Sequence, residues 1–366
     1  MNNSTNKLKI GVITFHRAIN YGAILQVFAL QEKLKELGTD PYILDYRNKK
    51  LEQHHKEMKL FDSKGIKGLI VYMLMKKNYN KKFNAFRDFS RKYINTSEPY
   101  YSLKELEKAD SIYDKYVTGS DQVWNYAISN LDSAYFLSFT SNISKKNSYA
   151  ASFGVKSLPE KETKEYYNLL KDFNNILVRE KQGAKIINQL FNKNVDVVLD
   201  PTLLITKDKW FELAKDNLKF KYILVYAFGG SKYIMELAKN LSMMTGYKII
   251  AISSTYRKSK NVRYIKTAGP EEFLGLFKNA EYIVTNSFHG TAFSINFNKQ
   301  FFTELLPNSV GTNSRMEDIL DLFDLRNRQI LSSDSSVANF PIDYSKVNQI
   351  LEIEREKSIN LLKDIL

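Results

Sequence analysis

Short apolar runs that end in polar, glycine-containing turns recur along the 366-residue chain, and this pattern most constrains its fold. Residues 9–15 form such a run near the N-terminus, and residues 222–228 form another in the second half. Both are rich in β-branched and aromatic residues, as is typical of parallel strands buried on both faces. Helical patterns follow the turns. The sequence therefore predicts an α/β protein in which strands and helices alternate.

Two doubly wound, Rossmann-like domains that face each other across a cleft are the architecture favoured by this pattern, because the chain is too long for one ordinary core. We predict an N-terminal domain over residues 1–205, with a helical, Lys-rich and aromatic insertion outside the sheet at about 48–100. A C-terminal domain follows over 206–340. The last helix, 341–366, could pack back on the N-terminal domain. Residues 195–199 are predicted to be a further strand.

The composition excludes several classes of protein. Without cysteine there is no disulfide framework, no thiolate metal site and no cysteine nucleophile. No metal-ligand cluster stands out, so we predict no metal. The first residues lack the apolar region of a signal peptide. The longest apolar run, residues 68–75, is much shorter than the ~18 residues of a membrane span. We expect a soluble, cytoplasmic protein.

The net charge of +14 favours anionic partners or substrates. Nucleic acid, anionic lipid and phosphorylated substrates all fit this charge, as does a chain that is simply rich in lysine and asparagine. No zinc-finger spacing, aromatic RNP pattern or basic recognition helix is present, so we predict no nucleic-acid partner. Peripheral contact with an anionic membrane, at its inner face, is more plausible than DNA binding.

His289 is the leading candidate for catalysis. It lies in residues 285–291, a turn between a predicted strand and a predicted helix, where backbone N–H groups and the helix dipole favour an anion. The chain has only four histidines, and His16 lies at a similar turn. His289 could pair with a phosphate or carboxylate, or take a hydroxyl proton. The alternative is a structural residue that caps backbone groups.

The neighbours of His289 are candidates for the same site. Ser287 and Thr291 could donate hydroxyl hydrogen bonds to a ligand, or act as ordinary helix caps. Gly290 is expected to let the backbone approach a ligand.

The segment 119–125 combines a carboxylate with one of only two tryptophans. Asp121 is a candidate general base, and Trp124 could stack on a sugar face. The alternative is that Asp121 caps a turn and Trp124 packs in a core between the domains. The loop at Asn20 is less specific, since no dinucleotide-binding glycine pattern is present.

Two arginines are placed where an anion could bind. Arg179, followed by Glu180 at a strand exit, could clamp a carboxylate through its two-pronged guanidinium, or form a local ion pair. Arg315 stands at the start of a predicted helix, where the dipole disfavours a cation, which hints at a bound anion.

In chain order, these segments resemble the polysaccharide pyruvyl transferase family. The resemblance spans roughly residues 9–328. The motifs that carry it are Asn20-Tyr21-Gly22-Ala23 with Leu25-Gln26 and Ala29-Leu30, Gly119-Ser120-Asp121-Gln122-Val123-Trp124-Asn125, Ser148-Tyr149-Ala150-Ala151-Ser152-Phe153-Gly154, Val178-Arg179-Glu180, Asp200-Pro201-Thr202-Leu203-Leu204 and Thr285-Asn286-Ser287-Phe288-His289-Gly290.

The resemblance implies a GT-B-like pair of domains that transfers a pyruvyl group from phosphoenolpyruvate to a sugar diol and forms a ketal. The acceptor would be a bacterial surface polysaccharide or its lipid-linked precursor, and no cofactor beyond phosphoenolpyruvate is expected. His289 matches the family's active-site histidine, and Arg179 matches a basic residue that holds the donor. We expect catalysis by His289 and Asp121. Donor binding is expected from Arg179, Ser287, Gly290, Thr291, Arg315 and Asn20, and acceptor binding from Trp124, Gln122 and Asn125.

The chain departs from the family pattern at one position. Members often carry arginine two places before the histidine, where this chain has Ser287. Arg17, Arg263 or Arg315 could supply the missing charge. The departure motivates an alternative, a GT-B-type glycosyltransferase that uses a nucleotide-sugar, because a fold does not fix a function. A glycan-binding module without chemistry is a third possibility.

Overall fold

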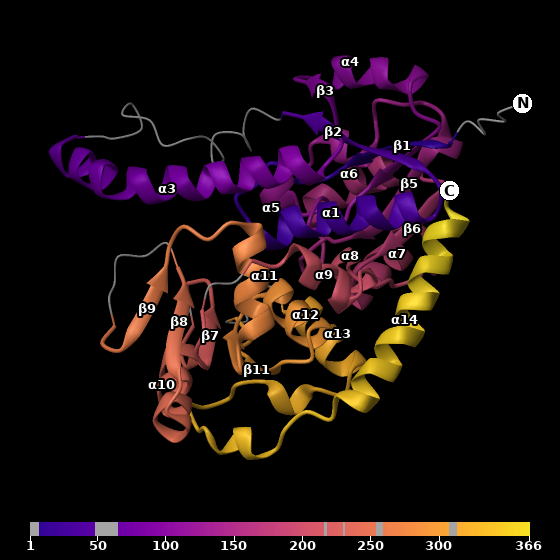
Figure 1. The fold of residues 1–366 in the computed structure, drawn as a ribbon. Coiled ribbons are helices and arrows are strands. Elements are labelled where there is room, and N and C mark those ends of the chain that lie inside the picture. The colour runs from indigo at the N-terminus through magenta and orange to yellow at the C-terminus, as the bar shows by residue number, and fades with distance from the viewer. Residues whose placement is uncertain (1–6, 48–64, 216–217, 230, 254–258, 307–312) are drawn as a thin grey trace, which may run out of the picture.

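Two α/β domains, each built on a parallel sheet, make up the protein (Figure 1). The computed structural model describes residues 7–47, 65–215, 218–229, 231–253, 259–306 and 313–366. The N-terminal sheet has the order β3-β2-β1-β4-β5-β6 and the C-terminal sheet the order β11-β10-β7-β8-β9. The predicted fold class is confirmed.

The N-terminal domain contains six strands and the helices that cover them. Its strands are β1 (Lys9–Ile13), β2 (Asp40–Tyr46), β3 (Thr96–Tyr100), β4 (Lys115–Thr118), β5 (Lys146–Ala151) and β6 (Asn175–Val178). Its α-helices are α1 (Tyr21–Glu36), α3 (Gly65–Tyr93), α4 (Leu103–Leu106), α5 (Tyr126–Ser129), α6 (Glu160–Leu170), α7 (Lys181–Phe191) and α8 (Pro201–Leu204).

The C-terminal domain repeats the strand–helix alternation. Its strands are β7 (Tyr222–Tyr226), β8 (Lys248–Ile252), β9 (Val262–Ile265), β10 (Tyr282–Thr285) and β11 (Gln300–Thr303). The α-helices of this half are α9 (Lys207–Leu213), α10 (Ile234–Thr245), α11 (Pro270–Asn279), α12 (Phe288–Asn296), α13 (Ser314–Leu322) and α14 (Tyr344–Asp364).

The predicted insertion is wrong at its end. Residues 96–100 form β3, the edge strand of the first sheet, rather than part of a helical insertion. The segment is short, polar and contains Pro99, which an edge strand tolerates because one side of it makes no ladder hydrogen bonds. Helix α3 does lie outside the sheet, and Figure 1 shows it extending past the body of the protein. Residues 48–64 lie outside the described part of the chain.

The strand predicted at residues 195–199 is also absent. The segment makes a single bridge between Val197 and Val178, next to the end of β6. It then leads through Asp200 into α8, whose first position is Pro201. A proline that starts a helix ends the extended segment before a ladder can form.

Helix α1 joins the two domains. Twelve of its sixteen residues are buried, because it packs against β2 and α8 and also contacts α3, α11 and α12. Tyr21 stacks on Phe273 of α11, with ring centroids 4.4 Å apart, and donates a hydrogen bond to the Ala268 carbonyl at 2.8 Å. One apolar core therefore runs from the first sheet into the second domain.

Helix α14 returns to the first half of the chain. It runs along the outside of the protein from the C-terminal domain toward β6 and α7 (Figure 1). Ser358 accepts a hydrogen bond from the Leu199 amide, and the Arg355 guanidinium donates to the Leu203 carbonyl. These contacts fix the loop that carries Asp200.

The unpaired backbone N–H groups at the start of α10 bind a side chain of the protein itself. The buried carboxylate of Glu304, just after β11, accepts hydrogen bonds from the amides of Lys232, Tyr233 and Ile234 at 2.7–3.2 Å. An anion in this place complements the helix dipole and the unpaired N–H groups.

We expect Glu304→Ala to lower the free energy of unfolding by about 1–3 kcal/mol, because three amides lose a charged acceptor. Glu236→Ala, at an exposed position of the same helix, is the matched control and should change it by less than about 0.5 kcal/mol. Urea denaturation measures both. Equal losses in the two variants would contradict the capping role.

Candidate active site

Arg179 is the centre of a buried ionic cluster at the carboxyl edge of the first sheet. It follows β6, and its Nη1 donates to Asp200 Oδ2 at 2.8 Å while its Nη2 lies 3.3 Å from Asp121 Oδ1. Its Nε lies 4.0 Å from Glu180 Oε2. Burial alone would lower the pKa of Arg179, but the three carboxylates outweigh this effect and raise it. Arg179 is therefore a permanent cation.

Asp200 connects this cluster to the second domain. Its carboxylate is buried, accepts the amide and hydroxyl of Thr202 as the cap of α8, and lies 3.6 Å from His289 Nε2. Burial by itself raises the pKa of this carboxyl, but the charges of His289 and Arg179 prevail and hold the pKa well below its usual range. Asp200 is therefore a fixed anion between Arg179 and the His289 ring.

His289 lies in the interface between the domains. It occupies the first turn of α12 and is 8% exposed, and its Nε2 has no hydrogen-bond partner among the described residues. The ring packs directly over Gly22 of α1, where an added Cβ would overlap the imidazole. Glycine at position 22 therefore provides the space for the histidine.

Phe288 is flanked by two guanidinium groups. Arg179 lies 4.7 Å from its ring centroid and Arg315, from α13, lies 5.8 Å from it. Burial, with repulsion from Arg179, lowers the pKa of Arg315 to about 10. Burial raises the pKa of Glu180 despite these arginines. Arg315 Nε is enclosed and has no hydrogen-bond partner in the described part of the chain, so it could receive an anion.

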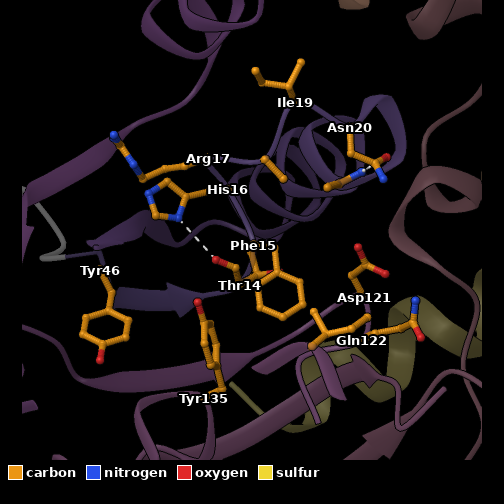
Figure 2. A pocket seen from close by; sticks show the side chains of 13 residues that line it. Thr14, Phe15, His16, Arg17, Ile19, Asn20, Tyr46, Asp121, Gln122 and Tyr135 are labelled. Atoms are coloured by element: carbon orange, nitrogen blue, oxygen red, sulfur yellow. Dashed lines mark hydrogen bonds between the residues drawn. The ribbon is translucent and has the colours of Figure 1, made fainter. Parts of the chain in front are cut away.

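Two cavities lie on either side of the Asp121–Arg179 pair. The β1 cavity, about 340 Å³, opens at the ends of β1 and β2 and is lined by Phe15, Asn20, Tyr46, Asp121, Gln122 and Tyr135, among others (Figure 2). The β6 cavity, about 240 Å³, includes Arg179, Asp200, Phe288, Arg315, Asp318 and Leu203 in its lining. Asp121 belongs to the first cavity and Arg179 to the second, so one ion pair separates them.

A model of the polysaccharide pyruvyl transferase family matches residues 20–303 of this chain, a span that contains Gly22, Asp121, Arg179, Asp200 and His289. The chain belongs to this family. Its expected class, a polysaccharide pyruvyl transferase enzyme, is thereby confirmed. No curated protein sequence matches the chain at a significant level.

Similar solved structures are found for the fold. The UDP-GlcNAc 2-epimerase from Methanocaldococcus jannaschii has 15% sequence identity and a TM-score of 0.50, over 95% of this chain and 92% of that one. S. aureus MnaA, in a co-structure with UDP, has 12% identity and a TM-score of 0.51, over 97% of this chain and 96% of that one. At such identities the likeness shows the fold alone. The pyruvyl transferase family member therefore has a GT-B-like arrangement of two domains.

The structure places several of the expected residues at the two cavities. Asp121, Gln122 and Asn20 line the β1 cavity, and Arg179 and Arg315 line the β6 cavity. Asn20 also caps α1 through its carbonyl oxygen. These positions are compatible with the expected roles and do not test them.

One expected contact is wrong in this pyruvyl transferase. Trp124 is completely buried in the first domain, with its Nε1 donating to the Tyr135 carbonyl, so it offers no face to a sugar. The Thr291 hydroxyl donates to Thr303, and an added Cβ on Gly290 would overlap Thr285; these local contacts leave their expected roles as predictions. A tryptophan looks the same in a sequence whether it packs in a core or stacks on a sugar.

The hydrogen bonds of two further expected residues are used locally. Ser287 caps α12 by accepting a hydrogen bond from the Gly290 amide. Because this residue is a serine, position 287 offers no guanidinium to an anionic substrate. Asn125 caps α5, and its amide donates to Gln122. Of the arginines considered as substitutes for Ser287, Arg315 lies in the ionic cluster, whereas Arg263 is exposed on β9.

Sequence analysis missed three components of the site. Asp200 and Phe288 were part of recognised motifs but were not assigned roles, and Gly22 was seen only as a loop residue. A fourth residue, His16, was noted without a role. It lies beside the β1 cavity (Figure 2). Its Nε2 is hydrogen-bonded to Asp45 at 3.1 Å, and its Nδ1 is hydrogen-bonded to the Thr14 carbonyl at 3.2 Å. Burial opposes the charge of Asp45, but His16 and Arg47 lower the pKa of its carboxyl.

The described residues contain no group of three or more His, Cys, Asp or Glu that could hold a metal ion. Within the same ranges, no helix combines the length and the apolar character that crossing a bilayer requires.

We expect Gly22→Ala to lower the free energy of unfolding by about 1–3 kcal/mol, because the new methyl group displaces the His289 ring. In a His289→Ala background the same substitution should be neutral or stabilising by up to about 1 kcal/mol, since alanine is the better helix former. Denaturation of the four proteins of this double-mutant cycle measures the coupling. Equal effects of Gly22→Ala in both backgrounds would show that the two residues are not in contact.

Proposed function

We propose that this pyruvyl transferase takes the pyruvyl group from phosphoenolpyruvate and forms a cyclic ketal with two hydroxyls of a sugar, in a surface polysaccharide or its lipid-linked precursor. The observation that carries the proposal is the continuous chain Asp121–Arg179–Asp200–His289, which connects a cavity suited to a small anion with a cavity suited to a sugar. Inorganic phosphate is the second product, and the reaction balances without a further cofactor.

The β6 cavity is assigned to the donor. Phosphoenolpyruvate carries a carboxylate and a phosphate, and this cavity presents Arg315 with an enclosed, unpartnered Nε and one side of Arg179. Hydrogen bonds from a charged donor to a charged acceptor are the strong ones, and arginine matches both anions in shape. The volume of about 240 Å³ suits a small molecule.

His289 is assigned as the proton donor. Its imidazolium delivers a proton to the methylene carbon of the enol, and the adjacent carbon, which becomes electron-poor, is then attacked by a sugar hydroxyl. Asp200, 3.6 Å away, stabilises the imidazolium and orients the ring as a positioning residue. Because only 8% of His289 is exposed, the domains must part at the Gly22–His289 contact before a substrate reaches the ring.

The β1 cavity is assigned to the acceptor. Asp121 takes the proton of the attacking hydroxyl, and the amides of Gln122 and Asn20 are placed to bond other hydroxyls. The second hydroxyl then displaces phosphate from the same carbon and closes the ketal. Its proton returns to His289, and the proton held by Asp121 leaves with the phosphate. The Asp121–Arg179 pair, at 3.3 Å, holds the base beside the donor site.

The alternative, transfer from a nucleotide-sugar, receives no specific support. A helix N-terminus is a ready site for a diphosphate, but the start of α10 in this chain is already occupied by the Glu304 carboxylate. The point between β7 and β10 where the strand order reverses is closed as well, since Asn286 bonds both the amide and the carbonyl of Phe228.

We expect Arg315→Met to weaken phosphoenolpyruvate binding by about 1.5–3 kcal/mol, or roughly 10–150-fold, because a charged hydrogen bond is lost. Arg263→Met, which removes an exposed arginine from β9, is the matched control and should bind normally. Titration calorimetry with phosphoenolpyruvate, and with UDP in parallel, measures both. Binding of UDP but not of phosphoenolpyruvate by the wild type would move the protein to the nucleotide-sugar alternative.

We expect His289→Ala to reduce turnover by about 10²–10⁴-fold with donor affinity little changed, because the ring acts on a proton in the transition state. Phosphate release from phosphoenolpyruvate with a diol-bearing glycan, followed by detection of an acid-labile ketal, measures this. Full activity of a correctly folded His289→Ala enzyme would refute the assignment.

A further inference from the structure

A third cavity, about 200 Å³, lies in the crevice between the two domains. It is bounded by Tyr226, Phe228 and Ser253 at the carboxyl ends of β7 and β8, by Tyr21 at the start of α1, and by Lys82 and Lys266. Lys82 comes from α3, the helix that extends past the body of the protein in Figure 1. The crevice thus combines residues from both domains and from α3.

The ammonium group of Lys82 is enclosed by aromatic rings rather than by carboxylates. It lies 4.5 Å from the centroid of Tyr21 and 5.6 Å from that of Phe86. Among the described residues it has no ion pair or hydrogen bond. Burial accordingly lowers the pKa of Lys82 to about 8. Contacts of a cation with aromatic faces recover only part of the free energy that removing a charge from water costs.

The position of this charge is fixed by the packing below it. Tyr21 is held between Lys82 and Phe273, and its hydroxyl is bonded to the Ala268 carbonyl. Phe86 is buried beside the same ring at 5.0 Å. A half-buried cation that is held in a defined place, without a negative partner among the described residues, is suited to bind an anionic group of a ligand.

We propose that this crevice binds a phosphate group carried by the glycan acceptor. Ile19 and Asn20 line both this crevice and the β1 cavity, so a ligand whose sugar lies in the β1 cavity can continue around the loop toward Lys82. Lysine binds phosphate as a point charge, and Phe228, 49% exposed, offers an apolar face next to it. The identity of the acceptor rests on the proposed function, whereas the anion site does not.

The test uses inorganic pyrophosphate as the probe of the crevice and phosphoenolpyruvate as the probe of the donor site. Titration calorimetry compares the wild type, Lys82→Met and Lys81→Met, an exposed neighbour on α3 that serves as the matched control. We expect Lys82→Met to weaken pyrophosphate binding at least tenfold and to leave phosphoenolpyruvate binding unchanged. Lys81→Met should leave both unchanged, and Arg315→Met should affect phosphoenolpyruvate alone.

Folding of the variant is checked by thermal unfolding without ligand. Methionine keeps the aliphatic stem and removes a half-buried charge that has no carboxylate beside it, so the Tm of Lys82→Met should equal or exceed that of the wild type. Lys82→Arg, which keeps the charge, should retain pyrophosphate binding within a few fold. Two results together would assign Lys82 to a structural role. In the first, Lys82→Met has a lower Tm and no longer binds pyrophosphate; in the second, Lys82→Arg has also lost pyrophosphate binding.

Three further outcomes would overturn the proposal: no pyrophosphate binding by the wild type, equal losses in Lys82→Met and Lys81→Met, or loss of phosphoenolpyruvate binding together with pyrophosphate. The last would place Lys82 in the donor site. Failure of the proposed function alone gives a different result. In that case the protein would not bind phosphoenolpyruvate but would still bind pyrophosphate in a way that depends on Lys82.

Discussion

The ion pair between Arg179 and Asp200 is the interaction on which the rest of the site depends. Each partner is almost completely buried, and neither could remain charged there alone. Arg179 also holds Asp121 at the edge of the β1 cavity, while Asp200 caps α8 and faces His289. The pair therefore sets the relative positions of Asp121, the β6 cavity and His289, which come from separate segments of the chain.

Position 287 carries a serine, and two arginines from other elements lie near the neighbouring Phe288. The serine there is used to cap α12, and the second guanidinium arrives from α13 on the other side of Phe288. Two arginines and three carboxylates act on one another electrostatically in this cluster. The carboxylates compensate the buried charge of Arg179, so an anion that enters the cluster competes with them.

Much of the fold could be predicted from the sequence, because buried parallel strands are apolar, β-branched runs and the helices between them show a helical spacing of apolar residues. The turn at His289 and the strand exit at Arg179 were found in this way. The edge strand β3 was missed because it is polar and contains Pro99, and its pairing with β2 depends on the rest of the sheet. Trp124 was misassigned because a buried tryptophan and a sugar platform share the same local sequence.

The relation of His289 to Gly22 could not be predicted for a different reason. The two residues are 267 positions apart, and only the docking of the domains brings them together. Asp200 was similarly hidden, since its importance lies in contacts with Arg179 and His289 and not in its own surroundings along the chain. Sites built between domains are specified by tertiary packing, and single-sequence patterns carry little of that information.

Helix α1 has a consequence for the protein as a folding unit. Most of it is buried, and the apolar core that surrounds it contains residues of both halves. A fragment that ended after the first domain would leave one flank of this helix, including Tyr21, in water, and would expose a large apolar surface. The second half of the chain therefore covers apolar surface that the first half cannot cover by itself.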